Sequence, residues 1–282
     1  MSTIKQTLKN VLPKPVVDAS RETLDAILRL PEWPAATFHS WRRSSNQRLQ
    51  TLKDSRKGER CFIIGNGPSL RQTDLSRLKG EATFGMNRFY LAFPEIGFQT
   101  TYYLSMNDLV IEQCADDILG LSMPRFVSWR ARRWLKPADD LFFLYTSYTG
   151  PHFGGADITR RLWEGATVTY VALQVAFYLG FQQAILIGVD HNFTTKGKPN
   201  TTIVSQGDDP NHFNPAYFGK GFRWQLPDLD TSERGYWMAR QAYESAGRKV
   251  LDATVGGMLQ VFPKIDFPEG INSSGDFRSK CL

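Results

Sequence analysis

The stretch that decides the fold is Cys61-Phe62-Ile63-Ile64-Gly65-Asn66-Gly67-Pro68-Ser69-Leu70. Its first four residues suit a buried strand, and the two glycines allow the backbone to turn and to leave its amides open. Pro68 suits the first turn of a helix, where a missing N–H leaves no hydrogen bond unmade. Amides beside a helix N-terminus attract phosphate, although the stretch matches neither a Walker loop nor the dinucleotide fingerprint. It predicts a strand, a turn and a helix with a nucleotide site at the turn; a turn that binds nothing is the alternative.

Beyond this stretch, short apolar runs alternate with helical patterns. The clearest helix is expected over about residues 167–179, with Gly180 as its C-terminal stop, and another over about 231–246. Buried strands that alternate with helices indicate an α/β fold, here a Rossmann-like, mainly parallel sheet flanked by helices. The expected strands cover residues 61–64, 82–85, 101–105, 125–129, 141–145, 184–188 and 249–252.

The rhythm of strands and helices sets the limits of the domain. It is interrupted over residues 192–230, where Asn, Gly, Pro and Asp abound, and a loop of this length predicts a lid or binding element. Polar sequence with Ser and Gly at the C-terminus predicts a mobile tail. The expected segments are an N-terminal helical extension over 1–57, the α/β domain over 58–268, and a flexible tail over 269–282.

The N-terminal extension leads into a cluster of basic residues. A first helix is expected near Leu24 and is stopped by Pro31 and Pro34, and a second, polar helix covers about residues 37–55. Arginines and lysines recur over residues 42–60, with aromatic residues just upstream. Such a segment can rest on an anionic membrane surface, so peripheral contact with the inner membrane is one expectation; a solvated helix is the alternative.

Composition bounds the class of protein. The chain of 282 residues is 41% hydrophobic and 13% aromatic, which suits a globular domain with a core. No apolar run approaches the ~20 residues that span a bilayer, and the first residues lack the apolar core of a signal peptide. Three cysteines without metal-like spacing suit a reducing compartment, so a cytoplasmic location is expected. A net charge of +6 does not by itself imply nucleic acid, and no nucleic-acid-binding signature is present.

Several polar residues fall where a parallel sheet binds its ligands, beyond the carboxyl ends of its strands. The turn at residues 65–69 and Asp190, which follows the sixth expected strand, share that edge. Asp190 could bind a ribose or sugar hydroxyl or steer a base, or it could only cap its turn. Asn87 follows the second strand and could read a base or ribose, or simply occupy a turn. Thr167 and Thr169 begin the long helix, where a hydroxyl meets a phosphate or caps the helix.

His212 is the best candidate for a catalytic residue. Histidine exchanges a proton near neutral pH, as general-base catalysis requires, and a position in the long loop permits movement onto a bound substrate. A loop histidine that only bonds its own turn is the alternative, and His191 competes because it follows the strand-end aspartate. His39 and His152 have no such context.

The charges of the long loop are weaker signals. Lys220 and Arg223 could neutralise a leaving phosphate after lid closure, although solvated loop charges are the simpler explanation. Asp228-Leu229-Asp230 fits the Asp-x-Asp pattern by which many nucleotide-sugar transferases hold a divalent ion, but it lies in a polar linker. No pair of histidines and carboxylates has convincing metal-ligand spacing, so no metal is expected.

Taken together, four motifs resemble the bacterial sialyltransferases that build lipooligosaccharide, and the related central domain of motility accessory factors. The same motifs are similar to the broader group that contains archaeal hydroxymethylpterin diphosphokinases. Their order and approximate spacing agree over roughly residues 60–220. The motifs are residues 63–70, 87–90, 179–190 and 211–213.

This resemblance implies a site for a CMP-activated sugar. His212 resembles the general base that deprotonates the acceptor hydroxyl for an inverting displacement, beside Asp190. That chemistry needs no metal, because the CMP leaving group carries only one phosphate. Thr167 and Thr169 would lie on the phosphate side of the donor. The other donor-binding residues would be Gly65, Asn66, Gly67, Pro68, Ser69 and Asn87.

One position departs from the pattern of the sialyltransferases. They place tyrosines after the strand-end aspartate to stabilise the leaving phosphate, whereas this chain has His191-Asn192-Phe193 there. Tyr217, Lys220 or Arg223 could substitute. The departure bears on sialic acid itself more than on the CMP-sugar class, and Kdo or another nonulosonic acid is equally compatible.

The sequence therefore predicts a cytoplasmic glycosyltransferase that moves a nonulosonic-type sugar from a CMP-activated donor to a glycan or glycolipid acceptor, without a cofactor. Two alternatives stay open. A 6-hydroxymethylpterin diphosphokinase would need ATP and magnesium, with Asp190 or Asp108 as a metal ligand. A non-catalytic nucleotide-binding module would leave His212 with a structural role only.

Overall fold

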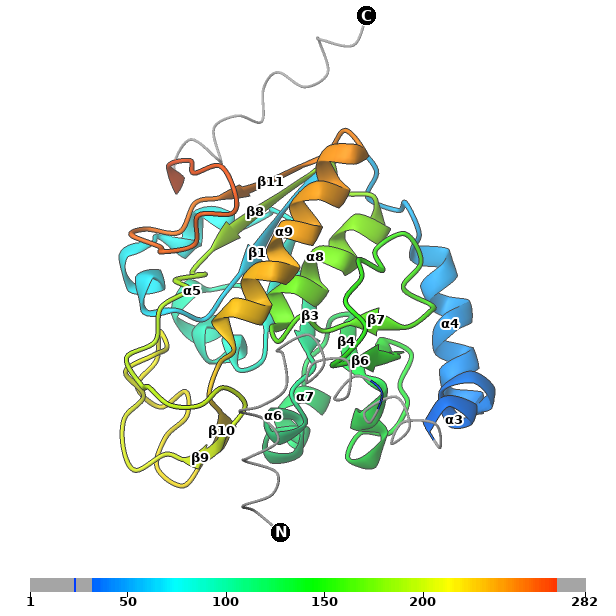
Figure 1. Ribbon diagram of the computed structural model, residues 1–282, viewed down its shortest axis with the longest axis horizontal. Coiled ribbons are helices and arrows are strands. Elements are labelled where there is room, and N and C mark those ends of the chain that lie inside the picture. Colours follow the sequence, from blue (N-terminus) through cyan, green and yellow to red (C-terminus); the bar gives the residue numbers. More distant parts are fainter. Residues whose placement is uncertain (1–22, 24–31, 268–282) are drawn as a thin grey trace, which may run out of the picture.

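The centre of the molecule is a seven-stranded sheet in which every neighbouring pair is parallel. The computed structural model describes residue 23 and residues 32–267 (Figure 1). Each expected apolar run is a strand of this sheet, which confirms the α/β, Rossmann-like fold. In spatial order the strands are β11 (Lys249–Asp252), β8 (Gln183–Ile187), β1 (Arg60–Ile64), β2 (Thr83–Met86), β3 (Tyr102–Ser105), β4 (Arg125–Ser128) and β5 (Leu141–Leu144).

Two long helices, α8 (Val168–Leu179) and α9 (Leu229–Ser245), cover one face of the sheet (Figure 1). The Thr167 hydroxyl accepts a hydrogen bond from the Thr169 amide at the start of α8, and Gly180 ends the helix with a φ of 96°. Both ends were expected, since a threonine cap and a left-handed glycine are sequence signals. Side chains of α8 pack on alternate residues of the central strands, such as Cys61 and Ile63.

Short elements cover the opposite face. The chain steps from β1 to β5 in one direction and then returns to β8 on the other side of β1, so right-handed crossovers fall on opposite faces of the sheet. Phe62 and Ile64 point to this second face and pack on Leu70 and Leu78. The covering elements are the 3-10 helices η1 (Pro68–Gln72), η2 (Leu75–Leu78), η3 (Phe89–Ala92) and η4 (Trp129–Arg133) and the short helices α5 (Phe93–Ile96), α6 (Asp108–Gln113) and α7 (Ala115–Leu119).

The segment after Pro68 corrects one expectation. It forms the five-residue 3-10 helix η1 rather than a longer helix with free N-terminal amides. Thr73 is extended, and Asp74 accepts a bond from the Ser76 amide to begin a separate 3-10 helix. A local aspartate cap thus competes with continuation of the first helix.

The N-terminal helices differ from the expected pair. Helix α3 (Glu32–Phe38) and helix α4 (Ser40–Leu52) meet at His39, which is extended and accepts a bond from the Trp41 amide. Pro34 does not stop a helix but lies in the first turn of α3, where no intrahelical N–H is needed. The helix expected near Leu24 and the tail over 269–282 lie outside the described residues.

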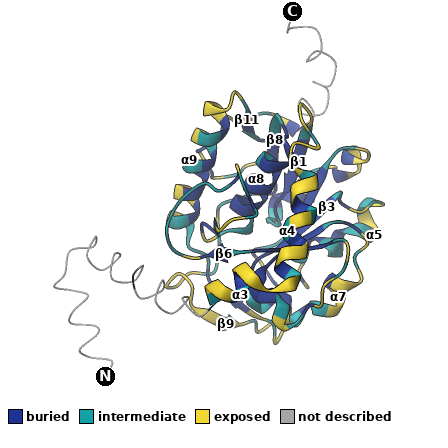
Figure 2. Cartoon of the chain, turned by 90° about the vertical axis from the view of Figure 1, so that its right-hand side faces the viewer, coloured by how far each residue is buried: buried dark blue, intermediate teal, exposed yellow. Residues whose placement is uncertain are grey.

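Helix α4 closes one edge of the sheet. It packs against the edge strand β5, where the Ser45 hydroxyl accepts a hydrogen bond of 3.1 Å from the Phe143 amide. Arg48 donates to backbone carbonyls of the segment that leads into β5, including that of Ala138 at 2.7 Å. Figure 2 shows α4 with an exposed outer surface and the buried strands behind it. An unpaired strand edge is thereby protected.

Several basic residues of the N-terminal cluster have internal partners. Arg42 is 1% exposed, Arg56 donates to the Tyr102 hydroxyl, and Arg60 pairs with Glu81. These three arginines are therefore not free to bind an anionic membrane, and membrane contact stays a prediction. No helix among the described residues has both the length and the apolar character needed to cross a bilayer.

The segment 192–230 is more ordered than a plain loop. It contains an antiparallel pair of strands, β9 (Thr202–Val204) and β10 (Arg223–Gln225), and a packed aromatic group that includes Tyr217, Phe218 and Trp224. A second small sheet joins β6 (Thr146–Ser147) to β7 (Leu162–Trp163) in parallel. Both pairs were missed because strands of two or three residues leave no periodicity to detect.

Candidate functional site

The site lies where the strand order reverses. The chain leaves β1 toward β2 and arrives at β8 on the other side of β1, which makes the carboxyl ends of these two strands the switch point where open α/β sheets bind ligands. The Gly65 amide donates to the Ile187 carbonyl at 2.7 Å, and the Gly67 amide donates to the Gly188 carbonyl at 2.9 Å. These two amides therefore join the strands and do not face a phosphate, contrary to expectation.

Asp190 fastens the turn to the end of β8. Its carboxylate accepts hydrogen bonds from the Ser69 amide at 3.1 Å and from the Ser69 hydroxyl at 2.7 Å. A Cβ atom on Gly67 would lie 1.7 Å from the Asp190 carboxylate, so only glycine allows this approach. Asp190 also lines the cavity described next, while Pro68 and Ser69 do not.

A cavity of about 500 Å³ opens above this edge, a size usual for small-molecule sites. Asn66 donates to the Met86 carbonyl, but its buried Oδ1 has no hydrogen-bond partner. Asn87 has a φ of 51° and accepts a bond from the Ser105 hydroxyl. None of the described residues that line the cavity is a lysine or an arginine. Its polar lining includes Asn66, Asn87, Asn107, Glu164, Thr167, Thr169, Asp190, His191, Asn211, His212 and Asp228.

His212 is held by a carboxylate. Its Nδ1 lies 2.7 Å from Oδ2 of Asp209, a residue only 4% exposed. Asp209 also accepts bonds from the amides of Asn211 and Phe218, which fix its orientation. With the carboxylate as acceptor, Nδ1 carries the proton and Nε2 is left as the basic nitrogen; this tautomer is assigned from the contact. An aspartate–histidine pair of this kind can remove a proton from a hydroxyl.

An aromatic wall supports the same histidine. The rings of His212 and Tyr217 stack with centroids 4.0 Å apart and planes 8° apart. Tyr217 is fully buried, and its hydroxyl accepts a bond from the Arg88 amide. Burial raises the pKa of Tyr217, so its hydroxyl stays protonated at neutral pH. The ring of His212 is therefore fixed from its Nδ1 side and from one face.

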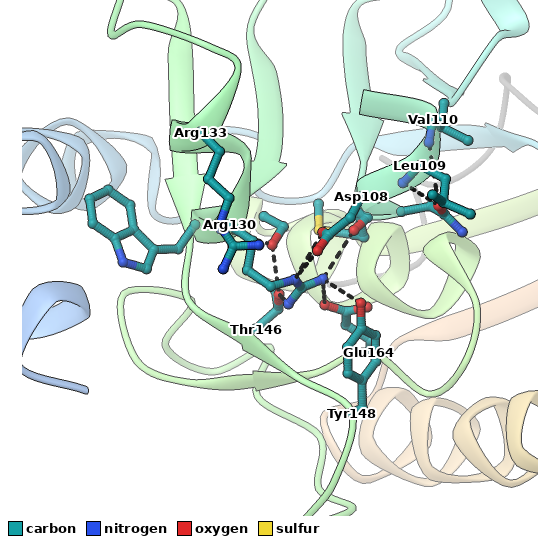
Figure 3. A network of polar contacts seen from close by, with 12 residues as sticks. Asp108, Leu109, Val110, Arg130, Arg133, Thr146, Tyr148 and Glu164 are labelled. Carbon is teal, nitrogen blue, oxygen red and sulfur yellow. Dashed lines mark hydrogen bonds and ion pairs between the residues drawn. The ribbon is translucent and has the colours of Figure 1, made fainter. Parts of the chain in front are cut away.

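A second polar network borders the cavity (Figure 3). The Arg130 guanidinium donates to Glu164 at 2.8 Å, to Asp108 at 2.9 Å, and to the hydroxyls of Tyr148 and Thr146 at 2.9 and 3.1 Å. Burial alone would lower the pKa of Arg130, but the attraction of Glu164, Tyr148 and Asp108 outweighs burial and raises it. Glu164 and Tyr148 line the cavity, so Arg130 fixes two cavity groups from behind.

The remaining expected site residues divide by position. Thr167, Thr169 and His191 line the cavity, and His191 lies 3.4 Å from the Glu233 carboxylate. Lys220 is exposed, and neither it nor Arg223 lines the cavity. Arg223 pairs with Glu112 at 2.9 Å.

Two histidines and the Asp-x-Asp pair have structural settings. His39 caps α4, and both ring nitrogens of His152 contact backbone carbonyls. Asp228 caps α9 by accepting a bond from the Thr231 amide, and Asp230 is exposed. In the described part of the chain, no group of three or more His, Cys, Asp or Glu residues is placed to hold a metal ion.

Sequence reasoning missed Asp209, Glu164 and Arg130. Asp209 left a weak signal, a carboxylate three residues before the candidate histidine in a turn-forming stretch. Arg130 left no signal of its own in the sequence, since its partners Asp108 and Glu164 lie 22 and 34 residues away in the chain.

Comparison with known proteins gives a family and two distant structures. The sequence model of the family described as 6-hydroxymethylpterin diphosphokinase MptE-like matches residues 37–196, more than half of the chain. No curated protein matches. The MAf glycosyltransferase from Magnetospirillum magneticum AMB-1 is similar at 14% identity with a TM-score of 0.47, over 79% of this chain and 38% of that one. This chain thus spans well under half the length of that protein.

The second similar structure is the sialyltransferase CstII from Campylobacter jejuni, solved with the substrate analogue cytidine-5'-monophosphate. Its identity is 16% and its TM-score 0.42, over 74% of this chain and 85% of that one.

Proposed function

The chain belongs to the 6-hydroxymethylpterin diphosphokinase MptE-like family, and from this premise we propose that it is a nucleotide-dependent transferase that acts on a hydroxyl. In the form that the site favours, it moves a nonulosonic-type sugar from a CMP-activated donor to a glycan or glycolipid acceptor. The observation that carries the proposal is the Asp209–His212 pair, whose histidine lines the switch-point cavity.

The reaction uses the free nitrogen of that pair. Nε2 of His212 takes the proton of the acceptor hydroxyl while its oxygen forms a bond to the anomeric carbon of the donor. The bond between that carbon and the phosphate oxygen breaks, its electron pair leaves with CMP, and the configuration at the carbon inverts. Asp209 accepts the Nδ1–H bond throughout and stabilises the imidazolium that forms.

Charge and unpaired groups in the cavity support a nucleoside monophosphate as the leaving group. The unpartnered Oδ1 of Asn66 accepts a hydrogen bond from an N–H or O–H of the nucleoside, and Asn87 and Thr167 also line the cavity. The described lining holds no lysine or arginine, so it suits one phosphate better than the larger charge of a triphosphate. Of the three residues considered for the leaving phosphate, Tyr217 lines the cavity, whereas Lys220 and Arg223 would have to move to reach it.

A second candidate function, pyrophosphoryl transfer from ATP to a hydroxymethylpterin, follows from the family's description. It would require a divalent ion, and the two carboxylates considered as its ligands are engaged. Asp190 accepts two bonds from Ser69, and Asp108 pairs with Arg130. As arranged, these residues do not fit a magnesium site, and His212 as a base for the attacking hydroxyl is common to both reactions.

A thermal-shift comparison of CMP, CDP, UDP, GDP and ATP, each with and without magnesium, separates the two reactions. A nucleotide that binds the native state raises the melting temperature. We expect a rise with CMP that is indifferent to EDTA, and release of CMP from CMP-N-acetylneuraminate or CMP-Kdo. A rise with ATP that needs magnesium, with none for CMP, would overturn the CMP-sugar form.

Substitutions in the pair test its role in turnover. His212→Ala and Asp209→Asn should each lower kcat by about 10²- to 10⁴-fold while the response to CMP persists. The double variant should lose little more than the worse single variant, because the two residues act as a unit. Asp208→Asn, a neighbouring exposed aspartate, is the matched control and should keep full turnover. Turnover that survives both single substitutions would contradict a histidine base.

A further inference from the structure

A second cavity, of about 520 Å³, lies between the N-terminal helices α3 and α4 and the segment around β6. It shares no lining residue with the first cavity. Strand β6 and the residues beside it separate the two: Ser147 and Thr149 line the second cavity, and Tyr148 between them lines the first.

A buried guanidinium forms part of the second cavity's wall. Arg42 is 1% exposed and donates from Nη2 to the Thr159 carbonyl at 2.8 Å, but its Nε and Nη1 have no hydrogen-bond partner. Burial lowers the pKa of Arg42 to about 10, and the attraction of Asp157 offsets this only in part. A buried charge without full hydrogen bonding is costly, and an anion that enters the cavity would remove that cost.

The same wall also contains a buried acceptor, on Asn46, to which no hydrogen bond is donated. Asn46 lies one turn after Arg42 on α4, so both side chains fall on one face of the helix. Its buried Oδ1 has no partner either. An oxyanion alone supplies acceptors for Arg42 but no donor for Asn46. A molecule that carries both an oxyanion and hydroxyl groups satisfies the two at once.

The remaining lining is of the same kind. Ser147 and Thr159 bring hydroxyl oxygens that can accept hydrogen bonds, Trp33 and Tyr145 bring aromatic rings, and Arg161 adds an exposed cation. Aromatic faces pack against the C–H face of a sugar ring, and the volume suits one or two sugar units.

We propose that this second cavity binds an anionic sugar, a phosphorylated or carboxylated one, with Arg42 and Arg161 on the oxyanion and Asn46 on a hydroxyl. The proposal does not depend on the reaction at the first cavity. The phosphate and the carboxylate share one recognition chemistry, and separate probes distinguish them.

The test measures binding of glucose 6-phosphate and of glucuronate to the full chain by calorimetry and thermal shift, with glucose and inorganic phosphate as the two half-probes. We expect at least one anionic sugar to bind more tightly than either half-probe. Arg42→Gln should weaken it about 10- to 100-fold, the usual worth of a charged hydrogen bond. Arg43→Gln, which removes an exposed charge from the next position of α4, is the matched control and should bind as the unchanged chain does.

Further arms keep the test decisive. Arg161→Gln alters an exposed residue, so it gives a result even where Arg42→Gln does not fold. Saturating CMP should not displace the probe, because the cavities are separate. The proposal is overturned if no anionic sugar binds at millimolar concentration, if inorganic phosphate binds as tightly, if CMP displaces the probe, or if Arg43→Gln weakens binding as much as Arg42→Gln and Arg161→Gln do.

Discussion

Among glycine-to-alanine substitutions in the turn after β1, Gly65→Ala should lower the stability of the protein the most. A Cβ atom at this position would lie 2.2 Å from the Gly188 carbonyl oxygen and 2.6 Å from its carbon. Cβ atoms essentially never lie closer than 3.0 Å to another heavy atom that is not bonded to them. The carbonyl oxygen would therefore have to move away from the Cβ atom by about 0.8 Å. Because both partners are backbone, the strands β1 and β8 must separate.

The expected loss follows from what that separation breaks. The Gly65–Ile187 and Gly67–Gly188 hydrogen bonds hold this edge. Two such bonds, at 0.5–1.5 kcal/mol each, together with the strain of overpacking give about 2–6 kcal/mol. For a domain of this size the melting temperature should fall by about 5–20 °C. Gly67→Ala should cost less, because its closest contact is the Asp190 side chain, which can rotate away.

Calorimetric melting and urea unfolding of the two variants provide the assay, with Gly207→Ala as the control because a Cβ there meets nothing within 4 Å. The effect of Gly67→Ala should shrink in an Asp190→Ala background, where the nearest contact is gone. A Gly65→Ala variant that melts within about 1 °C of the unchanged protein would refute the reasoning, as would a larger loss from Gly67→Ala.

Two further predictions concern buried groups. Burial raises the pKa of the Cys61 and Cys114 thiols, and the thiolate is the reactive form of cysteine. A Cys281→Ser variant at pH 8 should therefore react with Ellman's reagent only after unfolding. Rapid reaction of the native variant would contradict this prediction. Glu164→Gln should lower the free energy of unfolding by about 1–3 kcal/mol, since Arg130 loses one of its two carboxylates. Glu244→Gln, at an exposed position of α9, should change it little. Equal urea midpoints for the two variants would contradict this prediction.

The sheet was predictable because its strands are buried on both faces. Runs such as Cys61–Ile64 therefore read as continuous apolar sequence, and each became a strand. The ends of α8 were predictable for another reason: the Thr167 cap and the left-handed Gly180 act within one turn of the chain.

The features that the sequence did not predict depend on contacts between residues that are distant in the chain. The open amides expected at Gly65 and Gly67 are taken by carbonyls of β8 and the residue after it. The sequence pattern predicts a turn at these glycines, but it does not predict which strand lies beside that turn. Arg130 is a similar case, because its ion pairs with Glu164 and Asp108 join residues that are distant in the chain.

The candidate site contains residues that the sequence predicted and one that it did not. Placing His212 and Asn87 at the cavity was within reach of the sequence, because each follows from strand order or a loop position. The orienting carboxylate of Asp209 was not, since its role depends on the fold of the 192–230 segment around it.

The position of β1 in the sheet also determines when the molecule can be completed during synthesis. One side of β1 pairs with β2, the next strand to leave the ribosome, but its other side must wait for β8. The Ser69–Asp190 hydrogen bond joins residues 121 positions apart. Until that point an apolar strand presents an unpaired edge to other nascent chains, a known hazard for aggregation. A chain that ends before β8 would hold five of the seven strands of this sheet and would leave one side of β1 unpaired.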